Sequence, residues 1–113
     1  MPVTAAGKII AETVAEWEGI TPGPHRFGGN EFRVERREVV HVHGDSLVDI
    51  PFPKAIRNEL VANGAAEQHH VHPESGWVSV YLRESKDVER AVELLRKSYE
   101  LARASQEHAK RSS

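Results

Sequence analysis

The chain begins with hydrophobic residues at helical spacing and then changes to an alternating pattern. Ile10, Val14 and Trp17 recur four and three residues apart, which places them on one face of a helix predicted over about residues 4–18. The glycines and prolines of residues 19–24 then predict a loop. We therefore expect the first helix to be followed by the longest loop of the chain.

The middle of the chain alternates apolar and polar residues, as the strands of a half-buried sheet do. Phe32 and Val34 share one face of a first strand, and Val40 and Val42 share one face of a second. Residues 47–50 predict a further strand after a turn that contains glycine. The spacing therefore predicts a series of short strands joined by tight turns.

The second half of the chain predicts two helices separated by a hairpin. A short helix is expected over residues 53–64, because proline suits its start and glycine its end. Residues 68–71 and 77–82 are expected to form strands on either side of the Pro-Glu-Ser-Gly turn at 73–76. A long amphipathic helix begins at Ser85, where apolar residues repeat at alternating spacings of four and three.

The predicted order of elements is α-β(3-4)-α-β-β-α. Strands joined by short turns pair antiparallel, so the fold class is α+β, with a single antiparallel sheet and helices on one face. The other face of such a sheet can be partly open to water. We therefore look for functional side chains on that open face.

Composition narrows the possible functions without naming one. The chain has 113 residues, which predicts a single domain over residues 1–105 and a polar, disordered tail over 106–113. The absence of cysteine excludes disulfide scaffolds, cysteine zinc sites, iron–sulfur clusters and thiol nucleophiles. A formal net charge of -2 disfavours nucleic acid as a partner. With no long apolar segment and no leader pattern, we expect a cytoplasmic protein that does not enter a membrane.

The chain is unusually rich in histidine, with seven residues. His41 and His43 stand two apart on one predicted strand, so they project from the same face. His69 and His70 are adjacent on another strand, so at most one of them joins that face. We assign His41, His43 and His70 as catalytic candidates, one of them acting as general acid or base. Asp49 is a candidate ligand-binding carboxylate.

Two other interpretations of the histidines stay open. Imidazoles on a half-wet sheet face can simply form hydrogen bonds, and a His-x-His strand with a third histidine and a carboxylate can hold a metal ion. The chain contains no nucleophile elbow, P-loop, dinucleotide fingerprint or His-Glu-x-x-His helix. The sequence therefore assigns neither a metal nor a cofactor, and whether the protein is an enzyme stays undecided.

Aromatic residues add a candidate binding surface. Trp77 and Tyr81 lie four apart on one predicted strand, on the same face as Ser79. When exposed, such rings can stack on planar ligands. They can equally pack against a loop, the tail or a second copy of the chain, which makes a homodimer possible. A basic patch near the first hairpin would instead indicate nucleic-acid binding, and its candidates are Arg26, Arg33, Arg36 and Arg37.

Several short motifs follow one another along the chain. They are Gly-Pro-His-Arg-Phe-Gly-Gly at 23–29, Arg-Arg-Glu at 36–38, His-Val-His-Gly-Asp at 41–45, Asp-Ile-Pro-Phe-Pro at 49–53, His-His at 69–70 and Ser-Gly-Trp-Val at 75–78. In this order they resemble the small bacterial luciferase-domain family, which takes its name from similarity to the luciferase of luminous fungi. The resemblance covers about residues 8–103.

The resemblance implies a small-ligand-binding or cofactor-independent catalytic domain. The fungal enzymes of this resemblance oxidise a hispidin-type luciferin with dioxygen and no known cofactor. Carried over to this chain, the resemblance places part of the candidate site within the family's motifs. These residues are His25, Arg26, His41, His43, Asp49, His70 and Trp77. We expect His25 and Arg26 at the rim of a site on the open sheet face, with an unknown small molecule as its ligand.

A second resemblance concerns the last third of the chain. Gly-Trp-Val at 76–78 followed by residues 94–101 is similar to the end of the YjbR-like proteins, whose fold is a helix-flanked antiparallel sheet related to the frataxin type. These proteins are described as having a double-wing DNA-binding motif. The resemblance implies the same α+β architecture, and it keeps a nucleic-acid-binding or protein-interaction module as the alternative function.

Overall fold

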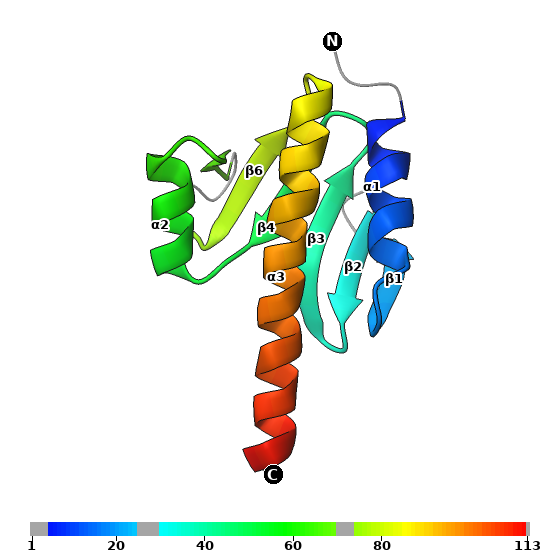
Figure 1. Cartoon of the computed structure of the whole chain (residues 1–113), viewed down its shortest axis with the longest axis vertical. Coiled ribbons are helices and arrows are strands. Elements are labelled where there is room, and N and C mark those ends of the chain that lie inside the picture. The colour runs from blue at the N-terminus through cyan, green and yellow to red at the C-terminus, as the bar shows by residue number, and fades with distance from the viewer. Residues whose placement is uncertain (1–4, 25–29, 70–73, 113) are drawn as a thin grey trace.

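A computed structural model describes the backbone of residues 5–24, 30–69 and 74–112, and the side chains in these ranges except those of residues 24, 30 and 106–112. Figure 1 shows one sheet with helices packed against it. In chain order the elements are α1 (Ala6–Ala15), β1 (Ile20–Pro24), β2 (Asn30–Val34), β3 (Arg37–His43), β4 (Leu47–Pro51), α2 (Lys54–Ala62), β5 (Glu67–Gln68), β6 (Trp77–Tyr81) and α3 (Ser85–Ser112).

The strands form one six-stranded sheet in the order β1-β2-β3-β4-β6-β5. Every neighbouring pair is antiparallel. Tight turns join β2 to β3 and β3 to β4, whereas α2 and β5 intervene before β6 returns to pair with β4. The predicted α+β class, the single antiparallel sheet and the order of elements are confirmed.

The helices lie on one face of the sheet, as predicted (Figure 1). α3 crosses that face against β3 and β4, and α1 lies beside α3 over β1 and β3. The buried residues facing the helices include the predicted strand positions Phe32, Val34, Val40 and Val42. Burial of these side chains, each worth about 1.5–3 kcal/mol, keeps the helices on this face. The site is therefore to be sought on the opposite face.

The predicted loop at residues 19–24 is wrong in part, because residues 20–24 form the edge strand β1. Proline lacks a backbone N–H, but an edge strand tolerates it because one side of the strand has no partner strand to bond. The helix α1 also ends earlier than predicted, at Ala15, and Gly19 takes a φ of 84° in the turn before β1. The glycine and prolines of residues 20–24, which are typical of turns, are therefore part of the edge strand β1.

The start of α1 depends on a close approach to the β3–β4 turn. The backbone N–H of Gly7 donates to Asp45 Oδ1 at 2.9 Å, so a side chain from the turn caps the helix. A Cβ at residue 7 would lie 2.1 Å from the carbonyl oxygen of Gly44. Glycine has a low helix propensity, but packing requires it at this position.

Both later helices begin close to where the sequence places them. α3 starts at Ser85, and Asp87 Oδ2 accepts the backbone N–H groups of Arg83 and Glu84 at 3.0 and 2.9 Å. α3 then continues to Ser112. No helix in the described part of the chain combines the length and the apolar character needed to cross a membrane.

Candidate functional site

A row of polar residues crosses the sheet on the face that the helices leave open. Glu31 on β2 pairs with His41 on β3, His41 with Asp49 on β4, and Asp49 with Ser79 on β6. Glu31, Asp49 and Ser79 are nevertheless 8%, 1% and 0% exposed. Buried polar groups need hydrogen-bond partners to offset the loss of water, so we expect each residue of this row to contact other polar side chains.

Asp49 lies at the centre of the row. Its Oδ1 accepts a hydrogen bond from Ser79 Oγ at 2.7 Å. Its Oδ2 lies 2.9 Å from His43 Nε2 and 3.3 Å from His69 Nε2. Because a carboxylate only accepts hydrogen bonds, the nearer contact places a proton on His43 Nε2. One buried carboxylate therefore orients the imidazole of His43 and contacts a second one.

His43 combines a buried partner with access to solvent. Its side chain is 31% exposed, whereas the side chain of Asp49 is 2% exposed. With Nε2 directed at Asp49, Nδ1 lies on the other edge of the ring and is the nitrogen that can accept a proton. This is the arrangement in which a carboxylate holds a histidine in one tautomer.

Trp77 assembles the aromatic rings of the site. The ring of His41 stacks on it with centroids 4.6 Å apart and an interplanar angle of 32°. His69 contacts the same indole edge-on, with centroids 6.4 Å apart. Two of the three described imidazoles around Asp49 thus pack against one indole. His41 and His69 on the open face are therefore joined through their contacts with the Trp77 ring.

The position of Trp77 is set by the residue before it. A Cβ on Gly76 would lie 2.1 Å from the carbonyl oxygen of Phe52, and the Gly76 carbonyl accepts the backbone N–H of Phe52 at 3.0 Å. Only glycine permits this approach. β6 therefore starts in contact with the end of β4, which brings Trp77 opposite Pro51.

A β-bulge at Val39 brings Glu38 to the same face as His41. Residues three apart on a regular strand point to opposite faces. In β3 the register shifts, because Phe32 pairs with Val40 and Arg33 pairs with Glu38. Val39 is the extra residue, and its carbonyl accepts a hydrogen bond from Ser98 Oγ on α3 at 3.3 Å. The bulge re-aims a side chain, which is a common role of bulges beside functional sites.

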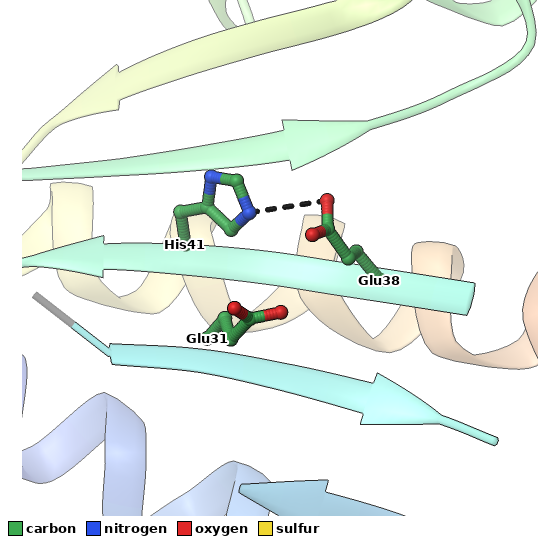
Figure 2. Close-up of side chains that lie close together, drawn as sticks. All are labelled: Glu31, Glu38 and His41. Carbon is green, nitrogen blue, oxygen red and sulfur yellow. Dashed lines mark ion pairs between the residues drawn. The ribbon is translucent and has the colours of Figure 1, made fainter. Parts of the chain in front are cut away.

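Glu38 and Glu31 form a second cluster with His41 and Arg33. Glu38 Oε2 lies 3.1 Å from His41 Nε2. Figure 2 marks this ion pair with a dashed line. Arg33 Nε donates to Glu31, and Arg33 Nη2 donates to Glu38 Oε1 at 3.3 Å. The hydrogen bond from Arg33 lowers the pKa of Glu31 below its usual value, although burial opposes this shift. Glu31 is therefore ionised at neutral pH.

The structure brings together four of the residues proposed from the sequence, which are His41, His43, Asp49 and Trp77. Tyr81 lies on the same face, one row away, opposite Leu47 and in contact with the guanidinium of Arg83 at 4.9 Å. Three further candidates lie outside the described residues, namely His25, Arg26 and His70.

The sequence did not single out several residues that the structure places in the site. They are His69, Ser79, Glu31 and Glu38, together with Arg33, whose pairing with carboxylates the sequence did not indicate. For Ser79, strand alternation predicts the correct face, between the two aromatic residues of β6, but indicates no role. For Glu38 it does not predict the face, because the side chain reaches this face only through the bulge at Val39.

Comparison with known proteins adds one finding. Residues 36–98, which are more than half of the chain, match the model of a family described as the Luciferase domain. No curated protein and no solved structure gives a significant match. The matched span contains β3, β4 and β6, and with them most of the described site. The resemblance to the YjbR-like proteins is not confirmed.

Proposed function

Because the chain belongs to the luciferase-domain family, we propose that the open face binds a small planar molecule and exchanges a proton with it. In this proposal His43 is the general base, and Asp49 is the residue that positions it. The observation that carries the proposal is the contact between a carboxylate that is 1% exposed and an imidazole that solvent can reach. A histidine serves proton transfer near neutral pH better than any other unperturbed side chain.

The proton moves along a short path. The bound molecule presents an acidic O–H or N–H to His43 Nδ1, which accepts the proton. The ring then carries one positive charge, and Asp49 stabilises that charge through the Nε2–H···Oδ2 contact of 2.9 Å. General base catalysis of this kind contributes about a hundredfold to ten-thousandfold in rate. The step needs no group beyond the bound molecule and these two side chains.

The rings of Trp77 and His41 supply the binding surface in this proposal. Offset stacking of aromatic groups is worth about 0.5–1.5 kcal/mol beyond the area that it buries. A planar molecule lying along these rings would reach His43, whose ring centroid is 6.3 Å from that of His41. His25, Arg26, His70 and Tyr81 keep their proposed place around the site, and we place the reaction in the cytoplasm.

The test uses 4-nitrophenol, a planar phenol whose absorbance changes when it ionises. At neutral pH we expect the protein to bind this probe and to raise the fraction present as phenolate. His43→Gln and Asp49→Asn should remove this gain in ionisation, whereas Trp77→Leu should weaken binding itself. His108→Gln, which changes a histidine far along the sequence from the site, is the matched control.

Two results would refute the proposal. One is the absence of saturable binding by the wild-type protein. The other is a phenolate fraction that is the same in the wild type and in His43→Gln, because the base would then lie elsewhere. A loss that appears equally in His108→Gln would assign the effect to histidines in general.

A further inference from the structure

The cluster on β2 and β3 has a feature that the proton-transfer site does not use. Glu31, Glu38 and His41 each offer a ligand atom, and these atoms all lie within 4.8 Å of one another. Figure 2 shows Glu38 and His41 on one strand and Glu31 on its neighbour. Among the side chains that the structure describes, these three form the one group of potential metal ligands whose ligand atoms lie this close together.

We propose that Glu31, Glu38 and His41 bind a divalent cation of the first transition series, and that the cation exchanges with the guanidinium of Arg33. This site is distinct from Asp49 and its two imidazoles. It lies one strand away, although His41 and Asp49 are paired in register across β3 and β4.

The distances suit a metal ion after a small closure. His41 Nε2 and Glu38 Oε2 are 3.1 Å apart. Neighbouring ligands around an octahedral ion with bonds of about 2.1 Å are separated by about 3 Å. Modest rotation of the carboxylate of Glu31 would bring the third ligand atom into the same shell. One imidazole with two carboxylates suits ions such as Mn²⁺, Fe²⁺ and Zn²⁺, since imidazole favours transition metals and carboxylate favours harder ions.

The charges of the cluster also favour a divalent ion. Two carboxylates face one guanidinium, so with His41 neutral the cluster keeps one negative charge. A divalent cation in place of the guanidinium would neutralise both carboxylates. Because the Arg33 side chain is 42% exposed, its guanidinium can turn into solvent without disturbing the core. The Glu31 side chain is 11% exposed and is therefore more buried than its partner Arg33.

The ligands come from elements that hold their positions. Glu31 and His41 are paired in register, and the bulge at Val39 directs Glu38 toward them. The stacking of His41 on Trp77 limits rotation of the imidazole. Ligands that are held in place before binding lose less conformational freedom when the ion enters. The arrangement therefore resembles a prepared site in which an arginine occupies the place of the metal.

The test titrates the full chain with Mn²⁺ and follows the loss of the free-ion signal by electron paramagnetic resonance. We expect saturable binding of one ion per chain, displaced by Zn²⁺. Glu31→Gln, Glu38→Gln and His41→Gln should each weaken binding by about tenfold or more. Arg33→Gln should tighten it by about threefold or more, because the competing cation is removed.

Two controls keep the outcome clear. Asp49→Asn and His43→Gln should leave the affinity for Mn²⁺ unchanged, and circular dichroism shows which variants are folded. A rise in the melting temperature of Arg33→Gln on addition of Mn²⁺ gives a second readout. The proposal is overturned if neither the wild type nor Arg33→Gln binds Mn²⁺, or if Arg33→Gln binds more weakly. It is also overturned if Asp49→Asn abolishes binding while Glu31→Gln does not.

Discussion

Single buried carboxylates organise the open face of this protein. Asp49 gathers a hydroxyl and two imidazoles, and Glu31 holds a guanidinium. A buried charge is costly unless it is paired and hydrogen-bonded, so each of these contacts serves stability as well as chemistry. Substitutions at the two carboxylates therefore have effects on folding that can be measured without knowing a ligand.

The first prediction concerns Asp49. Asp49→Asn should destabilise the fold by about 1.5–3 kcal/mol, because an amide loses the charge-assisted contact with His43 and cannot accept from every present partner. Ser79→Ala removes one partner only and should cost about 0.5–1.5 kcal/mol. Urea unfolding measures both values. A smaller cost for Asp49→Asn than for Ser79→Ala would contradict the central place of Asp49.

The second prediction concerns the acid limb of stability. Arg33 lowers the pKa of Glu31 from its ordinary 4.5, so the folded state favours the carboxylate. That stabilisation is present above pH 4.5 and is lost as the pH falls through the folded-state pKa. The difference in unfolding free energy between wild type and Glu31→Gln should therefore shrink between about pH 6 and about pH 3. The measurement is made with a chelator present, and a pH-independent difference would refute this role of Glu31.

At the scale of single residues, the sequence predicted the part of the site that follows strand alternation. His41 and His43 share a face because they are two apart, and Asp49 joins them because β3 and β4 are a hairpin. The sequence analysis assigns His70, and not His69, to the site, whereas the structure directs His69 to Asp49 and His70 lies outside the described residues. No pattern in the chain shows which of two adjacent histidines points inward when the strand before them is only two residues long.

At the scale of the strands, the site depends on two local irregularities. The bulge in β3 adds Glu38 to the open face, and the glycine before β6 sets the start of that strand. Hydrophobic alternation predicts regular strands and cannot show where one residue is inserted. This is why the elements were predicted well and the Glu31–Glu38–His41 cluster was not.

The third prediction tests the glycine before β6. Gly76→Ala places a Cβ against the Phe52 carbonyl, so the backbone must shift, at a cost of about 1–3 kcal/mol. The indole N–H resonance of Trp77 should move as well. Gly23→Ala is the matched control, because its Cβ would meet no atom within 4 Å. Equal stability of the two variants would show that the close approach at Gly76 is unimportant.

In the whole molecule, one face of the sheet packs the core and the other face carries the candidate site. Helices α1 and α3 bury the apolar face, and the other face carries the polar row and the rings over it. The sequence predicted this division from periodicity, and it predicted the α+β class from the order of elements. It could not predict that β6 returns beside β4, because strand order depends on packing between segments far apart in the chain.

The fourth prediction belongs to the charge of the whole chain. With a formal net charge of -2, and with Arg33 engaged by two carboxylates, the protein should show no salt-dependent affinity for duplex DNA. Fluorescence anisotropy with a labelled duplex at low ionic strength measures this. Binding that weakens steeply as salt is added would favour the alternative function as a nucleic-acid-binding module.

The central claim is that Asp49 holds His43 in the tautomer that leaves Nδ1 to accept a proton. Long-range ¹H–¹⁵N spectra of the imidazoles at a pH where they are neutral test it most directly. The account predicts that His43 carries its proton on Nε2, and that Asp49→Asn changes this ring to a mixture of tautomers. A proton on Nδ1 of His43 in the wild type, or spectra unaltered by Asp49→Asn, would contradict the account.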